Sequence, residues 1–233
     1  MVEKIKKELK NLADPQQAVV AQGFFKTGKG QYAHGDIFLG IKVPVLRKTA
    51  GKYNDLSLPA IKKFLQASIH EYRFFALVLL VNRFSSCDDS GRKKIVDFYL
   101  ENKNYVNNWD LVDMSAHAIL GRWLMNRDKD ILYRLAGSLR LWDRRIAVIS
   151  TFYFIKNNYY QETLNIAEIL LNDKEDLIHK AAGWMLREVG KRDMNAEEHF
   201  LKQNYSHMPR TMLRYAIEKF PEDLRFAYLK RPK

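Results

Sequence analysis

Helical periodicity dominates the pattern of apolar and polar residues along this chain. Apolar residues recur at steps of three and four in LPAIKKFLQ (58–66), YRFFALVLLVNRF (72–84), GRKKIVDFYLEN (91–102), RRIAVISTFYFIK (144–156) and AEEHFLKQ (196–203). Such spacing gathers apolar side chains on one side of an α-helix, and the alternation typical of a half-buried strand is hard to find. The pattern therefore predicts an all-α protein.

Helix start signals agree with this prediction. A capping or proline signal that resembles a helix N-terminus stands at Asp14-Pro15, at Ser57 before Leu58-Pro59, at Asn195 with Glu198 three residues on, and at Phe220-Pro221. Four glycines in GFFKTGKGQYAHGD (23–36) predict a loop.

A weak repeat runs through the second half of the chain. Helices of similar character contain Trp109, Arg145, Lys180 and Arg214, at steps of 36, 35 and 34 residues. A period of this length, with two helices in each unit, predicts an α-solenoid whose concave wall is built from one helix of each pair. Basic or aromatic residues at the same point of successive inner helices would line a groove. A non-repetitive helical bundle with chance spacing is the alternative.

The charge balance favours acidic partners. Lys and Arg number 39 against 27 acids, for a formal charge of +12 and a pI of about 9.6. This excess is typical of proteins that bind DNA, RNA or an anionic membrane surface, although it also serves solubility. Apolar residues at 47% and charged residues at 28% fit a soluble globular chain.

Cysteine usage and the N-terminus predict a cytoplasmic protein without a membrane partner. Cys87 is the sole cysteine, which excludes an intrachain disulfide and a Cys-rich zinc site. The first segment, MVEKIKKELKNLA, is amphipathic and charged, unlike a secretory signal. No stretch approaches the roughly 20 apolar residues of a membrane-spanning helix.

Three familiar site patterns fail. GFFKTGKG (23–30) nearly fits the phosphate loop GxxxxGK[ST], but Gly30 replaces the Ser or Thr that binds Mg²⁺, and no apolar strand precedes it. The six histidines show no HxxxH pair. No serine-elbow motif is present. We therefore expect no metal, no nucleotide cofactor and no other cofactor.

The stretch NWDLVD (108–113) places two carboxylates and an indole in what resembles the first turn of a helix. Trp109 and Asp113 are four apart and share a face, with His117 one turn further. Why a strongly basic chain should place acids there is the question that any function must answer.

Later helices offer partners for Asp113. Trp142 and Arg145 form an i,i+3 pair, and Lys180, Trp184, Arg187 and Lys191 lie near one face. If consecutive repeats stack, Asp113, Arg145 and Trp184 converge on one groove. The structural alternative is an ordinary Asp113–Arg145 ion pair between neighbouring helices, with the tryptophans in the core.

Five stretches, in order across most of the chain, resemble the DNA alkylation repair enzyme family of HEAT-like-repeat DNA glycosylases. They are DIFLGIKVPVLRK (36–48), NNWDLVD (107–113), LWDRRIAVISTFYFI (141–155), LIHKAAGWMLREVGK (177–191) and MPRTMLRYAIEKF (208–220). The resemblance implies an all-α solenoid of HEAT-like repeats, curved into a superhelix whose concave basic groove cradles duplex DNA. It also implies release of N3- or N7-alkylated purines.

The family's active site pairs two tryptophans with an Asp and an Arg. By resemblance, the WDxxD-type segment places Trp109 and Asp113 in these roles, LWDRR places Arg145, and KAAGW places Trp184. Two departures from a member of this family bear on the choice of lesion more than on the reaction: Asn108 stands where that member has a second aromatic residue, and Arg144 is an additional charge.

Because a cationic base leaves readily without a strong nucleophile, we predict a monofunctional hydrolase in which Asp113 stabilises an oxocarbenium-like transition state and positions water. Lys180, one turn before Trp184, is the rival nucleophile. We expect a single domain over 1–233, a monomer, located in the cytoplasm and associated with the nucleoid through DNA. The residues expected to contact double-stranded DNA are Arg47, Lys48, Arg144, Lys180, Arg187, Lys191 and Arg214. The alternative functions are a non-catalytic helical-repeat nucleic-acid-binding module and a protein scaffold.

Overall fold

The computed structural model describes residues 1–230, which divide into two compact units, Met1–Ser115 (unit 1) and the residues from Ala116 onward (unit 2). The described residues are helical and contain no strand; Ile37 and Ile69 form one isolated parallel bridge. The predicted all-α class is confirmed. Among these residues there is no helix with the length and apolar character needed to cross a bilayer.

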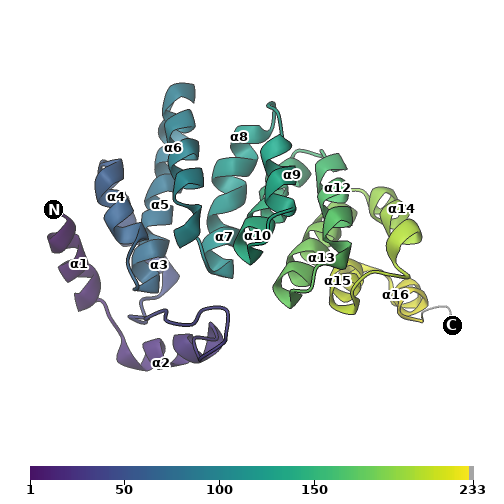
Figure 1. Cartoon of the computed structure of the whole chain (residues 1–233), viewed down its shortest axis with the longest axis horizontal. Coiled ribbons are helices and arrows are strands. Elements are labelled where there is room, and N and C mark those ends of the chain that lie inside the picture. Colours follow the sequence, from purple (N-terminus) through teal and green to yellow (C-terminus); the bar gives the residue numbers. More distant parts are fainter. Residues whose placement is uncertain (231–233) are drawn as a thin grey trace. The chain divides into compact units, whose positions relative to one another are not determined.

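Unit 1 contains seven α-helices and one short 3₁₀ turn (Figure 1). In chain order these elements are α1 (Val2–Asn11), α2 (Pro15–Phe24), α3 (Val43–Gly51), α4 (Leu58–Leu65), α5 (His70–Ser86), α6 (Asp89–Glu101), η1 (Lys103–Tyr105) and α7 (Trp109–Ala116).

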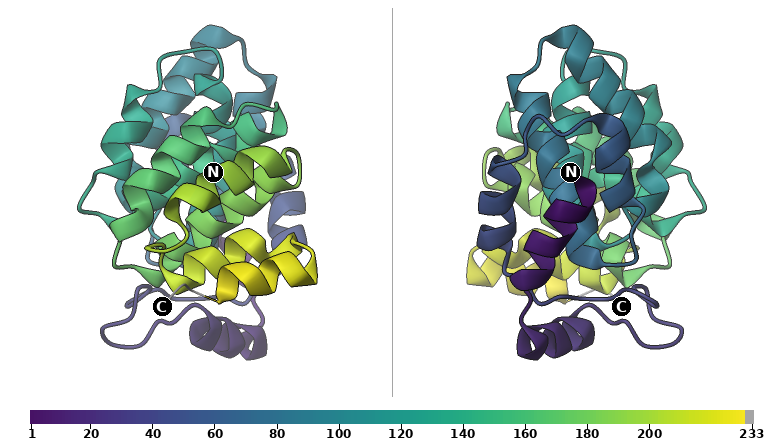
Figure 2. Two further views of the ribbon diagram at one scale, coloured as in Figure 1. Left: turned by 90° about the vertical axis from the view of Figure 1, so that its right-hand side faces the viewer. Right: turned by 90° about the vertical axis from the view of Figure 1, so that its left-hand side faces the viewer.

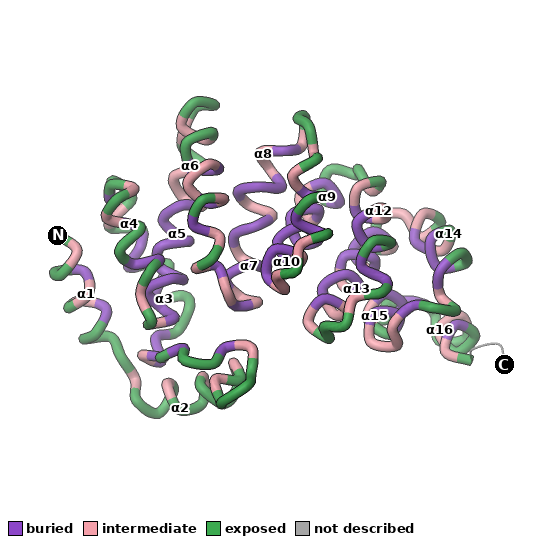
Figure 3. The backbone as a smooth tube through the Cα atoms, in the orientation of Figure 1, coloured by how far each residue is buried: buried purple, intermediate pink, exposed green. Residues whose placement is uncertain are grey.

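Helix α5 is the centre of unit 1, and both α3 and α4 pack against it. Twelve of its residues are buried, whereas α2 buries none (Figure 3). Figure 2 shows α2 and the loop after it together at one end of the unit. This segment is attached where Asp14 N–H donates to Leu39 O over 2.8 Å. A Cβ on Gly40 would lie only 2.2 Å from Asp14 O, so this contact requires glycine.

Unit 2 continues as a row of shorter helices. They are η2 (His117–Gly121, a π-helical turn), α8 (Arg122–Leu124), α9 (Asp130–Ala136), α10 (Leu141–Ser150), α11 (Phe152–Lys156), α12 (Gln161–Ile169), η3 (Leu170–Asn172), α13 (Asp176–Gly190), α14 (Met194–Asn204), α15 (Arg210–Ala216), η4 (Ile217–Lys219) and α16 (Glu222–Leu229).

The repeat spacing corresponds to consecutive packed helices in unit 2. Arg145 lies on α10, Lys180 on α13 and Arg214 on α15, and α13 packs against both of the other two helices. A row of repeats that contact only their neighbours also divides into compact units. One repeat-built domain over 1–233 stays a prediction.

Two details of the sequence prediction were wrong. The segment 144–156 is two helices, because Ser150 and Thr151 hydroxyls donate to Ile146 O and Val148 O, and α10 ends there. Asn195 does not cap a helix, since α14 begins at Met194 and Asp193 accepts the Ala196 N–H. The signal at Asp14 is confirmed, because its carboxylate accepts from the Gln16 and Gln17 N–H groups.

Candidate active site

Helix α7 presents Trp109 and Asp113 as the sequence predicted. The helix begins at Trp109, and Asn108 occupies the capping position because its carbonyl accepts the Val112 N–H over 3.1 Å. Leu111 and Val112 are fully buried, whereas Trp109 and Asp113 are half-buried on the adjoining face. The sequence predicted His117 on the same face, one helical turn further. The α-helix ends at Ala116, however, and His117 begins a π-helical turn, so the α-helical spacing does not extend to it.

Aromatic rings cover the indole of Trp109. The Phe25 ring stacks on it at 5.2 Å between centroids with an interplanar angle of 13°, and Phe24 meets it edge-on at 5.8 Å. Phe25 also stacks on Phe38 at 4.9 Å, and Phe38 stacks on His70 at 4.5 Å. A row of rings thus connects the indole to a histidine inside unit 1.

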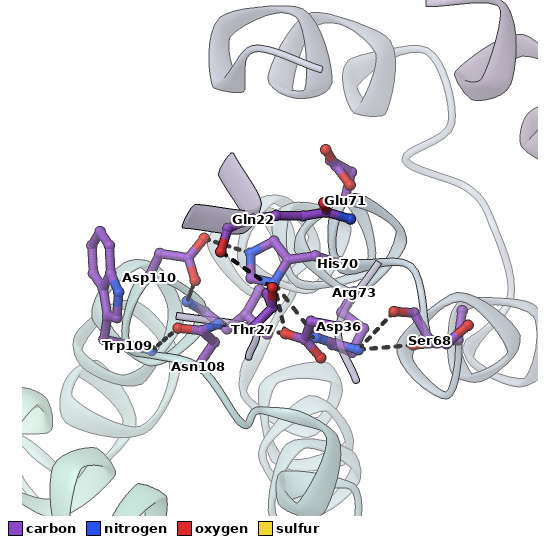
Figure 4. A network of polar contacts seen from close by, with 12 residues as sticks. Gln22, Thr27, Asp36, Ser68, His70, Glu71, Arg73, Asn108, Trp109 and Asp110 are labelled. Atoms are coloured by element: carbon purple, nitrogen blue, oxygen red, sulfur yellow. Dashed lines mark hydrogen bonds and ion pairs between the residues drawn. The ribbon is translucent and has the colours of Figure 1, made fainter. Parts of the chain in front are cut away.

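That histidine belongs to a polar cluster, formed by the buried residues Asp36, His70, Arg73 and Asn108 together with the partly buried Asp110 (Figure 4). His70 Nε2 lies 2.8 Å from Asp110 Oδ2, and His70 Nδ1 lies 3.4 Å from Asp36 Oδ2. Arg73 binds the same Asp36 oxygen at 2.6 Å, and Asn108 Nδ2 donates to it at 3.4 Å. We call these five residues the α7 anchor.

Electrostatics within the α7 anchor favour the charged forms. Burial alone would lower the pKa of His70, but hydrogen bonds to Asp110 and Asp36 outweigh burial and raise it above its ordinary value. Burial would raise the pKa of Asp36, but the His70 hydrogen bond and the Arg73 charge hold it below its ordinary value. The cluster thus brings two basic and two acidic side chains together, and the shifts of His70 and Asp36 both favour their charged forms.

A cavity of about 180 Å³ adjoins this cluster. Its walls are mainly apolar, but they also include the imidazole of His70 and the carboxyl groups of Glu71 and Asp110. The Glu71 carboxylate accepts hydrogen bonds from the backbone N–H groups of Leu39, Gly40 and Ile41. Among the described residues, no group of three His, Cys, Asp or Glu side chains is arranged to hold a metal ion.

Unit 2 holds the other two predicted active-site residues, Arg145 and Trp184. Arg145 is only 5% exposed, and its guanidinium donates to Leu177 O over 2.5 Å, which ties α10 to the first turn of α13. Trp184 is half-buried on α13; its Nε1–H donates to Glu188 at 3.2 Å, and Phe152 lies 5.6 Å away. Both residues thus have fixed surroundings within their unit.

His117 also packs edge-on against Phe152, with ring centroids 5.4 Å apart. Burial, together with the nearby Lys156 charge, lowers the pKa of His117 to about 4. This imidazole is therefore neutral near pH 7.

Comparison with known proteins gives these residues a context. The family model for DNA alkylation repair enzymes matches residues 5–220. The chain belongs to the DNA alkylation repair enzyme family. It is an enzyme of DNA repair, and the family implies that DNA is its substrate.

A solved structure from Enterococcus faecalis, described as a predicted DNA alkylation repair enzyme, is similar to the chain with a TM-score of 0.71 and 17% identity. The similarity covers 90% of this chain and 97% of that one, and at this identity it shows the fold. No curated protein matches the chain.

Most of the predicted DNA-contacting cations have carboxylate partners. Arg144 binds Asp173 at 2.5 Å with only 15% of its side chain exposed, whereas Arg47, Lys48 and Arg214 are exposed. The remaining ion pairs are Lys180–Asp176 at 2.7 Å, Lys191–Glu188 at 2.6 Å and Arg187–Glu218. Contact of all seven cations with DNA stays a prediction.

The sequence interpretation missed the α7 anchor. Its central partners are far apart in the chain, since His70 is 34 residues from Asp36 and 40 from Asp110. The only local signal was the first acid of NWDLVD, Asp110. In the structure this acid holds its own helix to α5, which answers half of the question that the stretch raised.

Proposed function

We propose that the chain is a monofunctional DNA glycosylase that hydrolyses the N-glycosidic bond of cationic N3- or N7-alkylated purines in duplex DNA. The observation that carries this proposal is the half-buried Trp109–Asp113 pair, four residues apart on α7, in a family that repairs alkylated DNA. The enzyme acts as a monomer and without a cofactor in this proposal.

The chemistry suits an acid in a basic protein. Alkylation at N3 or N7 places a positive charge on the base, so the base leaves readily without a strong general acid. As the bond from C1′ to the base breaks, its electron pair neutralises the base and positive charge develops on the sugar. A carboxylate near C1′ stabilises that charge electrostatically and orients the attacking water.

Trp109 supplies the second element of this site. An indole face attracts a cation by about 0.5–2 kcal/mol, depending on how far the pair is removed from water. The Phe25 and Phe24 rings restrict the indole from two sides. A restricted indole holds its face in one direction, which favours binding of a cationic sugar in one geometry.

The proposal assigns Arg145 and Trp184 of unit 2 to the same reaction. Arg145 is held by Leu177 O and Trp184 by Glu188. Because Arg145 is buried, Arg145→Lys tests its planar, multiple-donor geometry at constant charge. Trp184→Phe tests the indole while keeping an aromatic ring. Both variants should lower the excision rate if the assignment holds.

Water, rather than Lys180, attacks C1′ in this mechanism. A lysine nucleophile must be neutral. The Lys180 ammonium lies 2.7 Å from Asp176, and the hydrogen bond from Lys180 is the main cause that lowers the pKa of Asp176. Attack by lysine would require loss of that ion pair, and a cationic base does not demand so strong a nucleophile.

The test is product analysis with a duplex that carries a single N7-methylguanine. The expected products are free 7-methylguanine and a strand that stays intact until alkali cleaves it at the abasic site. Absence of free base above the rate of spontaneous loss would contradict the proposal. A non-catalytic nucleic-acid module would bind DNA more tightly after Asp113→Asn, and a scaffold would show no salt-dependent DNA affinity.

A further inference from the structure

The first turn of α7 is held on both sides of Trp109. On one side, the Asn108 side chain accepts the Trp109 N–H at 2.8 Å and donates to Asp36 at 3.4 Å. On the other side, Asp110 is bound by His70 at 2.8 Å. The residue that carries the indole therefore lies between two residues that are tied to other elements of unit 1 (Figure 4).

His70 is the group that joins these two ties. Its two ring nitrogens face the carboxylates of Asp110 and Asp36, and it is only 3% exposed. An imidazolium ring has two N–H donors and can serve both carboxylates, whereas a neutral imidazole has one. When the imidazolium of His70 loses one of its two N–H protons, either Asp36 or Asp110 therefore loses its hydrogen-bond donor.

The ring row gives His70 a second connection to the indole. Phe38 stacks on His70 at 4.5 Å, Phe25 on Phe38 at 4.9 Å, and Trp109 on Phe25 at 5.2 Å. Phe25 also lies 5.0 Å from the His70 ring. A shift of the histidine ring is thus transmitted both through Asp110 and through the aromatic side chains against which Trp109 packs.

We infer that His70 is a positioning residue for the excision reaction, because it fixes the first turn of α7 and hence the direction in which Trp109 and Asp113 point. The inference rests on the proposed function. His70 itself is buried, so it does not contact DNA. It acts through Asp110, Asp36 and the ring row.

The charges that face His70 set the direction of the pH effect. They are Asp110 from α7, Asp36 from the loop before α3, Arg73 from α5, and the neighbouring Glu71, whose carboxylate is bound by backbone N–H groups. With His70 charged, two cations balance Asp36 and Asp110; with His70 neutral, the α7 anchor has one net negative charge. The first turn of α7 should therefore loosen as pH rises through the raised pKa of His70.

The test variant is His70→Gln, which keeps a polar side chain but cannot bridge two carboxylates. We expect a roughly 10- to 100-fold lower single-turnover excision rate, because misplacement of a reacting group by about 1 Å has this effect. DNA affinity should stay within about twofold. His199→Gln, at an exposed histidine of α14, is the matched control and should excise at the wild-type rate.

The variant Phe64→Leu distinguishes a loss of excision rate caused by misplacement of α7 from one caused by a general loss of stability. Phe64 is fully buried on α4, where it packs on Phe75 and Tyr72 of α5. This variant should lose stability yet keep the excision rate. Equal loss of rate in Phe64→Leu and His70→Gln would overturn the positioning role.

A second readout does not depend on activity. The chain has four tryptophans, so 5-fluorotryptophan labelling gives four ¹⁹F signals, and Trp109→Phe identifies that of Trp109. In the wild type the Trp109 signal should shift with pH around a midpoint above the ordinary histidine value of 6.5. In His70→Gln this shift should be absent and the signal should differ from that of the wild type.

The outcomes separate the inference from the proposed function. An unchanged Trp109 signal in His70→Gln, without pH dependence in the wild type, would overturn the inference whatever the activity. A wild-type protein that releases no base would overturn the proposed function, while the Trp109 signal would still decide whether His70 orients α7.

Discussion

Glu197 offers a stability prediction that can be worked through from the structure. This carboxyl lies in the first turn of α14, is only 1% exposed, and its Oε1 atom has no hydrogen-bond partner. Burial raises the pKa of Glu197 to about 9, although the Arg187 charge acts in the opposite direction. The side chain is therefore protonated near pH 7 in the folded chain, and Glu197→Gln replaces it with an amide of the same shape.

The free-energy difference follows from linkage. The folded pKa of about 9 lies above the ordinary value of 4.5, so the folded state binds more protons, and stability falls as pH rises between these values. At about 1.4 kcal/mol for each pH unit, keeping Glu197 protonated costs about 3 kcal/mol at pH 7. Glutamine does not titrate. The stability of Glu197→Gln relative to the wild type should therefore rise by about 1.4 kcal/mol per pH unit between about pH 5 and 8.

Urea unfolding of the wild type and of Glu197→Gln across this pH range measures the difference in their free energies of unfolding. Groups that titrate in the same way in both proteins cancel in this difference. Glu198→Gln is the matched control, because it removes a more exposed carboxyl that pairs with Lys202 at 3.1 Å on the same helix. A stability difference between Glu197→Gln and wild type that is constant across this range would refute a protonated Glu197.

Three further predictions concern packing, DNA and the nucleophile. Gly183→Ala should destabilise the protein by about 1–3 kcal/mol in urea unfolding, because its Cβ would lie 2.4 Å from Met212 O between α13 and α15. Affinity for undamaged duplex should fall steeply with salt and should not depend on sequence, since bound phosphates release counterions; salt-independent binding in a titration would contradict this. Borohydride should trap no covalent protein–DNA adduct, and an adduct in the wild type that is missing in Lys180→Ala would make the enzyme a lyase.

Much of the fold could be predicted because the signals are local. Apolar spacing within α4, α5 and α6 determines which side of each helix is buried, and the sequence contains that spacing directly. The break at Thr151 could not be predicted, because it depends on hydroxyl groups that bind carbonyls within an otherwise continuous apolar pattern. Competing caps only two residues apart, Asp193 and Asn195, gave the wrong start for α14.

The candidate site, too, could be predicted only where the signal is local. The Trp109–Asp113 face follows from a four-residue spacing on one helix, so the sequence predicts it. The α7 anchor depends on contacts between residues 34 to 72 positions apart, and no local pattern identifies them. Arg144 was predicted only as a DNA contact. Its ion pair with Asp173, 29 residues away in the chain, depends on how α10 packs against its neighbours.

The central claim is that the Asp113 carboxylate stabilises the positive charge that develops as the base leaves. Single-turnover release of 7-methylguanine from duplex DNA by Asp113→Asn tests it most directly, with Asp97→Asn, at an exposed carboxylate that pairs with Lys93 on α6, as the control. The account predicts a rate about 10²- to 10³-fold below wild type for Asp113→Asn with DNA binding retained, and an unchanged rate for Asp97→Asn. Near-wild-type release by Asp113→Asn would show that the carboxylate is structural and that the proposed active site is wrong.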